Sequence, residues 1–210
     1  ASTFDTEVVG EMTDIIRKQM YYVGFRQALS PVVDITRDPR WGRITETYGE
    51  DAALTSAMAS AFVKGIQGDE LKEGVLATAK HFAGHGITEG GLNMGRNIVS
   101  ERDMREIHCK PFQCAITEAG LKSVMNSYCS VNGEPVVGSK KMLTDILRGE
   151  MGFQGFVVSD YLSLDRLVDP FAVAENFEEA GIRAIQAGLD VEYPRSKGFS
   201  YKMKESIESG

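Results

Sequence analysis

Asp160 is the carboxylate that this sequence places best for chemistry, because it follows the apolar run of residues 156–159 in the motif GFVVSDY. A carboxylate at the C-terminal end of a buried strand can act as a nucleophile, a general base or a metal ligand. The same residue can also cap the helix that follows, and its position alone favours this structural role. The polar residues that meet Asp160 in space must therefore decide between these interpretations.

Lys80 and His81 stand at the end of a second apolar run, VLATA at residues 75–79. A lysine that enters from an apolar strand is costly to bury unless its ammonium group is paired. A salt bridge that closes the structure is therefore one interpretation. The functional interpretations are a cation that binds hydroxyl groups and a lysine that forms a Schiff base.

The four-residue spacing of His81, His85 and Glu89 would suit a metal site if this segment were a helix. Four glycines argue against such a helix and favour a loop that approaches a ligand closely; they stand at positions 84, 86, 90 and 91. We therefore expect no metal ion at these residues.

Two further candidates are the cluster RWGR at residues 40–43 and Tyr128, which follows the run SVMN. Guanidinium groups and aromatic faces suit sugar hydroxyls and rings. The structural alternatives are an arginine paired with the carboxylate at position 46, 50 or 51, and a half-buried core tyrosine. Otherwise Tyr128 can donate its hydroxyl to a nearby carboxylate. Together the candidates predict a site for a neutral, polyhydroxylated substrate.

The elements that must position these residues follow from the hydrophobic pattern. Helices are expected to begin at the capping residues Asp5, Asp51, Ser100 and Ser139, and another helix covers residues 172–187. The second helix should bury the face with residues 54, 57, 58, 61, 62 and 66. Short apolar runs alternate with the helices at residues 28–33, 75–79, 122–127, 156–159 and 188–191. This β-α-β-α order favours a parallel sheet with right-handed crossovers.

Each apolar run ends in polar residues, and in a β/α barrel the carboxyl ends of the strands share the rim that carries the chemistry. These residues are Asp34, Lys80 with His81, Asn126 with Tyr128, Ser159 with Asp160, and Asp190 with Glu192. Residues far apart in the sequence are therefore expected to converge. About five such units do not close a barrel of eight strands. The fold class predicted is thus α/β, an incomplete (β/α)8 TIM-like barrel that is part of a larger protein.

The composition of the chain limits the classes of partner that it can bind. The chain has 210 residues, of which 42% are hydrophobic, and a net charge of −7. This acidic balance argues against nucleic acid or an anionic membrane as a partner. No apolar run reaches the roughly 18 residues of a membrane span. The three cysteines lack zinc-site spacing and are expected to be buried free thiols, which favours a reducing compartment such as the cytoplasm.

Five motifs in order resemble glycoside hydrolase family 3, the family of β-glucosidases and β-xylosidases. They are SPVVDITRDPRWGRITETYGED at residues 30–51, KHFAGHG at 80–86, EGGLN at 89–93, SVMNSYCSVNGEPV at 123–136 and GFQGFVVSDY at 152–161. Any one of them can occur by chance, whereas all five in this order are specific. The resemblance implies that residues 1–210 are part of the N-terminal barrel domain of such an enzyme.

The resemblance also implies roles for single residues. Asp160 corresponds to the catalytic nucleophile, and Lys80, His81 and Arg43 correspond to ligands of the hydroxyl groups of the bound sugar. Tyr128 matches the tyrosine that lies beside the nucleophile.

Two positions depart from the family pattern. Tyr161 stands where tryptophan is common, so it offers a smaller aromatic wall to the acceptor. The family's further sugar-binding arginine falls near Leu92, and Arg96, four residues on, is the candidate for that role.

The implied reaction is retaining hydrolysis of terminal β-linked glucose through a covalent glycosyl-enzyme on Asp160, without a metal or organic cofactor. Lys80 and Arg43 would help to keep the carboxylate ionised. The resemblance places an aspartate that grips the sugar upstream of Ala1. It places the acid/base glutamate in an α/β-sandwich domain beyond Gly210.

Four alternatives stay open. The substrate can be a β-xyloside. KHFAGHG also resembles KHFPGHG of the β-N-acetylhexosaminidases in the same family, although ITEGGLN follows here without their Asp-Ser-His. A Schiff-base aldolase would use Lys80, and borohydride trapping of a carbonyl substrate would reveal it. Finally, these 210 residues alone can be a sugar-binding or structural fragment without activity.

Overall fold

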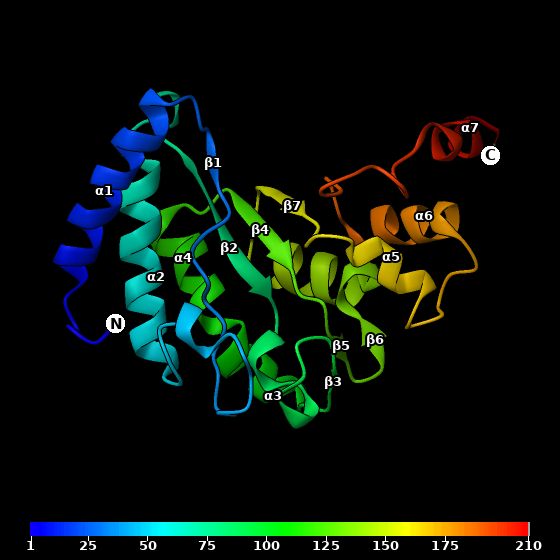
Figure 1. Cartoon of the computed structure of the whole chain (residues 1–210), viewed down its shortest axis with the longest axis horizontal. Helices are drawn as coiled ribbons and strands as arrows, with labels where there is room; N and C mark the ends of the chain where they lie inside the picture. The colour runs from blue at the N-terminus through cyan, green and yellow to red at the C-terminus, as the bar shows by residue number, and fades with distance from the viewer. Residues whose placement is uncertain (210) are drawn as a thin grey trace.

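The computed structural model describes residues 1–209 and shows a parallel sheet against which helices pack (Figure 1). Its strand order is β1-β2-β4-β7, and every neighbouring pair is parallel. An isolated parallel bridge between Val158 and Val191 puts residues 188–191 where a fifth strand would lie. The strands are β1 (Gln27–Ala28), β2 (Leu76–Phe82), β4 (Ser123–Asn126) and β7 (Phe156–Val158). Consecutive parallel strands with helical crossovers confirm the predicted α/β class and the arc of a barrel.

The first strand is shorter than the predicted 28–33. Pro31 has no N–H to give to a sheet, and β1 ends at Ala28. The segment nevertheless runs on beside β2, because Thr78 N donates to Ser30 O and Val33 N donates to Lys80 O. Residues 30–34 are therefore held against β2 up to the point where Lys80 and His81 begin.

The N-terminal helices begin where their caps predict. The Asp5 carboxylate accepts from Glu7 N and Val8 N, and the Asp51 carboxylate accepts from Leu54 N. Ser100 Oγ accepts from Asp103 N. The helices are α1 (Thr6–Tyr22), α2 (Ala52–Gln67), α3 (Glu101–Asp103) with the π-helical turn η5 (Met104–His108), and α4 (Lys110–Ala119).

The predicted face of α2 is partly wrong. Ala57 is exposed, whereas Ala59 and Val63 are fully buried. The reason is that α2 packs against α1 on one side and α4 on the other, so more than one face is covered.

The C-terminal half follows the prediction less closely. Ser139 Oγ accepts from Met142 N at the start of the predicted helix, which runs to Glu150 in π-helical form. The helix predicted at 172–187 starts only at Phe177, where Asn176 caps it, and a short helix precedes it. The helices are η7 (Lys141–Glu150), α5 (Ser163–Val168), α6 (Phe177–Ala187) and α7 (Tyr201–Ser209).

A small sheet lies near the carboxyl ends of the main strands (Figure 1). It consists of β3 (Arg96–Asn97), β5 (Ser130–Val131) and β6 (Glu134–Pro135). Asn132 and Gly133 form its turn, both with positive φ. Short 3-10 turns complete the chain at η1 (Ile44–Glu46), η2 (Leu71–Glu73), η3 (His85–Ile87), η4 (Glu89–Gly91) and η6 (Val136–Gly138).

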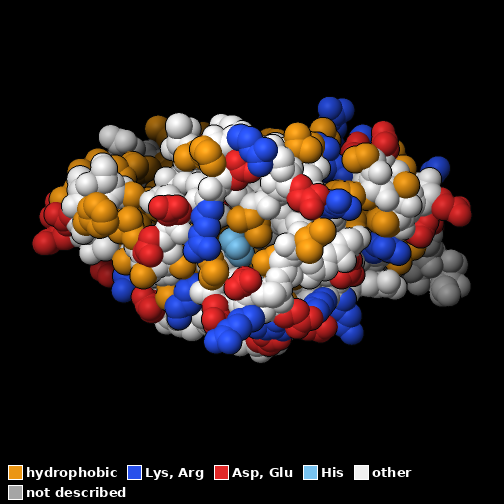
Figure 2. All heavy atoms as spheres, turned by 90° about the horizontal axis from the view of Figure 1, so that it is seen from below, with side chains coloured by type: hydrophobic (Ala, Val, Ile, Leu, Met, Phe, Trp, Pro, Cys, Tyr) orange, Lys and Arg blue, Asp and Glu red, His pale blue; other side chains and the backbone are white. Residues whose placement is uncertain are grey.

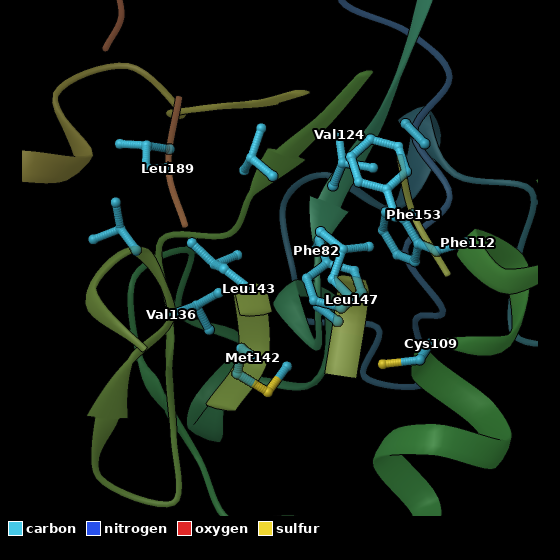
Figure 3. Packing of buried hydrophobic residues seen from close by; sticks show 14 of the residues in the cluster. Phe82, Cys109, Phe112, Val124, Val136, Met142, Leu143, Leu147, Phe153 and Leu189 are labelled. Atoms are coloured by element: carbon cyan, nitrogen blue, oxygen red, sulfur yellow. The ribbon is translucent and has the colours of Figure 1, made fainter. Parts of the chain in front are cut away.

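The core lies between the sheet and the helices (Figure 3). The rings of Phe82 and Phe112 meet edge-on at 5.1 Å, and Phe153 and Leu147 pack in the same cluster. All three cysteines are buried free thiols, as the sequence predicts; they are Cys109, Cys114 and Cys129. None of the helices within residues 1–209 is long and apolar enough to cross a membrane.

Candidate active site

The candidate residues meet at the carboxyl ends of the strands. Lys80 and His81 belong to the last part of β2, Asn126 ends β4, and Asp160 follows β7. In Figure 1 the arrows of β2 and β4 run toward the small sheet. Figure 2, seen from that side, shows a histidine near the middle of the face, with basic side chains next to it and acidic ones around it.

Asp160 does not cap a helix. Its side chain is 10% exposed, and Oδ1 accepts a hydrogen bond of 2.7 Å from Tyr161 N. Helix α5 begins later, after Leu162, with no side-chain cap. The Asp160 backbone N–H donates to Asn126 Oδ1 at 3.2 Å, which fixes the loop to β4. The second oxygen, Oδ2, is buried without a hydrogen-bond partner among residues 1–209. The lone pairs of this oxygen are therefore not used in hydrogen bonds within the described residues.

His81 is held between a carboxylate and a guanidinium. Its ring Nδ1 lies 2.7 Å from Asp34 Oδ2, and its Nε2 lies 3.1 Å from Arg43 Nη2. The same Nε2 is 3.5 Å from Asp160 Oδ2. Burial lowers the pKa of His81 to about 3, so the ring is neutral. Burial also raises the pKa of Asp34, to about 6.

Arg43 connects two histidines. Besides His81, it donates from Nη1 to His85 Nε2 at 3.3 Å, and it forms a two-point ion pair with Glu46 at 2.8 Å. Of its five N–H groups, four are thus used within residues 1–209, which leaves one on Nη1. Arg43 therefore forms the structural ion pair with Glu46 that the sequence offered as an alternative, and it also interacts with the charge of Asp160.

Lys80 has no ion-pair partner within 4 Å among the described residues, so the salt-bridge interpretation finds no support. Its side chain is half-buried, and burial lowers its pKa, while the negative charge of Asp160 acts in the opposite direction. An ammonium group that interacts with the charge of Asp160 but has no carboxylate partner within 4 Å is available to a ligand.

The two tyrosines lie at the edge of the site. Tyr128 OH donates to the backbone oxygen of Tyr161 at 2.8 Å, and Arg166 stacks over its ring. Its hydroxyl also interacts with the carboxylate of Asp160, as the sequence predicts. Burial and the charge of Asp160 raise the pKa of Tyr128. Tyr161 itself is 47% exposed, with its ring 6.3 Å from that of Tyr193.

Three of the residues considered lie away from this arrangement. Arg96 is exposed on β3 and pairs with Glu89, so the structure does not bring it to Asp160. Arg40 is exposed and pairs with Asp38. Trp41 is 1% exposed and packs edge-on against His85 at 5.3 Å, so it presents no open face to a sugar ring.

The metal interpretation of residues 81, 85 and 89 is not supported. Both histidines bind Arg43, and Glu89 pairs with Arg96. Within residues 1–209 no group of three His, Cys, Asp or Glu side chains is arranged to hold a metal ion.

The sequence interpretation undervalued two residues. The sequence predicts Asp34 only as a polar residue at a strand end and His85 only as a possible metal ligand, yet both are buried in the centre of the network. The feature that indicates a role for Asp34 is its position at the end of the apolar segment that pairs with β2. Its contact with His81 depends on two separate strands, so spacing alone could not reveal it.

The buried histidines predict a loss of stability in acid. Burial lowers the pKa of His81 and His85 to about 3 and that of His108 to about 4, whereas unfolded histidine titrates near 6.5. The unfolded chain therefore takes up protons first, and stability present above pH 6.5 is lost as the pH falls. Between pH 7 and 5 each histidine costs about 2 kcal/mol. Asp34, with its raised pKa, offsets part of this loss between pH 6 and 4.

Urea unfolding of the full-length protein at both pH values, with hydrogen exchange in β4 as the probe, measures this effect. His108→Phe should reduce the loss, because it removes one of the three protons. Equal free energies of unfolding at pH 7 and pH 5 would contradict the prediction.

Comparison with known proteins gives a family match over the whole chain. The model of the glycosyl hydrolase family 3 N-terminal domain matches residues 1–210. A protein named beta-xylosidase from Formosa agariphila is 40% identical over 197 residues, which is 91% of this chain and 27% of that protein. A lysosomal beta glucosidase from Dictyostelium discoideum is 34% identical over 218 residues, with shares of 100% and 27%. The chain thus spans about a quarter of the length of these relatives.

Solved structures of beta-glucosidases also superpose closely on this chain. A beta-glucosidase from Listeria innocua in complex with glucose superposes with a TM-score of 0.92 at 35% identity, covering 99% of this chain and 29% of that one. A b-glucosidase from Erythrobacter marinus superposes with a TM-score of 0.93 at 32% identity, covering 97% and 28%.

Proposed function

Since this chain belongs to glycosyl hydrolase family 3, we propose that the whole protein is a retaining, exo-acting β-glycosidase with Asp160 as its nucleophile. The observation that carries the proposal is a buried carboxylate at a strand end whose Oδ2 has no hydrogen-bond partner within residues 1–209 and whose charge interacts with the unpaired cation of Lys80. Because this chain covers only about a quarter of its relatives, the proposal includes parts outside residues 1–210. These are the rest of the barrel and a later α/β-sandwich domain that supplies the acid/base.

In this mechanism Oδ2 of Asp160 attacks the anomeric carbon and displaces the leaving oxygen, forming a covalent glycosyl-enzyme. A second carboxyl group, outside this chain, protonates the leaving oxygen and then activates the water that releases the sugar. Asn126 and the Tyr161 N–H keep the carboxylate aimed by holding the loop and Oδ1. No step requires a metal or organic cofactor.

Lys80 and the remaining N–H of Arg43 are proposed to donate hydrogen bonds to the hydroxyl groups of the sugar. His81 is proposed to accept from a hydroxyl group at Nε2, which it shares with Arg43. Hydrogen bonds from charged donors are strong. They accelerate the reaction most if they strengthen in the transition state, where the sugar ring becomes oxocarbenium-like. Lys80 and Arg43 also place positive charge beside the carboxylate, since both interact with the charge of Asp160. Arg96 keeps its proposed role only if a ligand breaks its pair with Glu89.

The proposed substrate is a terminal β-linked glucose, supported by the similarity to a beta-glucosidase structure that contains glucose. A β-xyloside is the second candidate, supported by the relative named beta-xylosidase. Values of kcat/KM of the full-length protein on 4-nitrophenyl β-glucoside and β-xyloside decide between them, and the glucoside is expected to be the better substrate.

Stereochemistry tests the reaction type. Proton NMR of glucoside hydrolysis by the full-length protein should show the β-anomer of the free sugar first, because two displacements restore the original configuration. If the α-anomer appears first, the enzyme inverts and Asp160 is not a covalent nucleophile.

Tyr161 should affect acceptor binding without disturbing the nucleophile. Its backbone N–H holds Asp160 Oδ1 and its backbone oxygen accepts from Tyr128, and both contacts survive truncation of the ring. Tyr161→Ala is expected to raise KM for aryl glucosides about five-fold, the equivalent of about 1 kcal/mol of aromatic contact. Tyr161→Trp should restore or improve binding. An unchanged KM in the alanine variant would exclude the ring from the acceptor site.

A further inference from the structure

Asp34 is the most deeply buried charged group at the site, and the mechanism above gives it no part. Its side chain is 0% exposed. One oxygen, Oδ2, accepts from the His81 backbone N–H at 3.2 Å and lies 2.7 Å from His81 Nδ1. Asp34 thus fixes both the backbone and the ring of a residue that also contacts Asp160.

The contacts of His81 determine where its proton lies. A guanidinium group has only donors, and Arg43 Nη2 is 3.1 Å from His81 Nε2. Nε2 must therefore be the acceptor. In the neutral ring the proton is then on Nδ1, where it donates to Asp34 Oδ2.

This tautomer matters to the nucleophile. Nε2 of His81 lies 3.5 Å from Asp160 Oδ2, the oxygen without a hydrogen-bond partner among residues 1–209. The opposite tautomer would present an N–H to that oxygen. A hydrogen bond there stabilises the ground-state carboxylate, and because the negative charge is lost as the glycosyl bond forms, it slows attack.

We propose that Asp34 is a positioning residue that holds His81 in its Nδ1–H tautomer and so keeps Oδ2 of Asp160 free to attack. The inference rests on the proposed function, because it assigns Asp34 a part in that reaction. Asp34 acts through His81 and does not touch the substrate. Arg43 supports the same tautomer from the other side of the ring.

Two variants of the full-length protein distinguish a role of Asp34 as hydrogen-bond acceptor for His81 from a role in packing alone. Asp34→Asn keeps an oxygen that can accept from Nδ1–H, whereas Asp34→Leu keeps the branching at Cγ, is larger, and has no acceptor. We expect Asp34→Leu to lower kcat on 4-nitrophenyl β-glucoside about 10- to 100-fold with little change in KM. Asp34→Asn should stay within about five-fold of the unmodified protein.

A third variant tests the route through His81. In a His81→Ala background, adding Asp34→Leu should lower kcat by less than about three-fold, because the path from Asp34 to Asp160 is already absent. An equal loss in both backgrounds would show that Asp34 acts independently of His81 and would overturn the proposal. Equal losses in Asp34→Asn and Asp34→Leu would overturn it as well.

The tautomer itself can be observed without any activity. Solid-state 15N spectra of the histidine-labelled, full-length protein should show His81, identified by its loss in His81→Ala, protonated at Nδ1. The Nε2–H form should gain in Asp34→Leu. Glu192→Gln is the matched control, since it alters another buried carboxylate, one that accepts from Gly198 N and Phe199 N. It should leave the His81 signal unchanged.

An Nε2–H signal in the unmodified protein, or no change in Asp34→Leu, would overturn the inference. This readout also separates it from the proposed function. A protein without glycosidase activity would contradict the proposed function alone, while the spectra still decide the tautomer.

Discussion

Replacing Asp160 with alanine in the full-length protein should lower kcat on 4-nitrophenyl β-glucoside about 10⁴-fold or more, with little change in KM. The variant loses the atom that forms the covalent intermediate, and a factor of about 10⁴ corresponds to about 5 kcal/mol of transition-state stabilisation. The fold should persist, because the backbone N–H of residue 160 still donates to Asn126. Steady-state kinetics measure the loss.

Two controls make this result specific. Asp169→Ala removes an exposed carboxylate just after α5 and should leave kcat unchanged. Azide added to Asp160→Ala should restore part of the activity and yield a glycosyl azide of the α configuration, because it replaces the missing nucleophile on the same side of the ring. Full activity in Asp160→Ala would exclude this residue as the nucleophile.

The second large effect is expected at Lys80. Lys80→Met should lower kcat/KM about 100-fold, because the variant loses a charge-assisted hydrogen bond to the sugar and the positive charge beside Asp160. Methionine has a similar length and fits a half-buried position, so the packing of β2 is maintained. Kinetics on the glucoside, together with circular dichroism as a check of folding, provide the measurement.

Lys72→Met is the matched control for Lys80, since Lys72 is an exposed lysine paired with Glu70. It should leave kcat/KM unchanged. If Lys80→Met behaves like Lys72→Met, the ammonium group of Lys80 has no part in the reaction. If borohydride traps a carbonyl substrate on Lys80, the protein carries out Schiff-base chemistry instead.

Local signals in the sequence predicted much of the fold. Asp5, Asp51 and Ser100 cap helices where side-chain chemistry indicated. Alternating apolar runs located the parallel strands. The prediction of elements failed where tertiary contacts or turn residues determine the length or presence of a strand. Pro31 cuts β1 short without displacing the chain from β2, and the small sheet around the Asn132-Gly133 turn is absent from the predicted elements.

The sequence predicted which residues form the site better than it predicted the contacts between their atoms. The positions of the polar residues at the ends of the strands, together with the family resemblance, predict which side chains come together. These are Lys80, His81, Arg43 and Asp160. Which atom faces which depends on burial and on elements distant in sequence. Trp41, for example, packs edge-on against His85 and is buried instead of facing a ligand.

Labelling with a 2-deoxy-2-fluoro-β-glucoside tests the central claim most directly. The fluorine slows both displacements, and a good leaving group lets the covalent intermediate accumulate. Mass spectrometry of peptides from the labelled full-length protein should find the sugar on Asp160, within the sequence GFVVSDY. A label on any other carboxylate would contradict the assignment of Asp160 as the nucleophile.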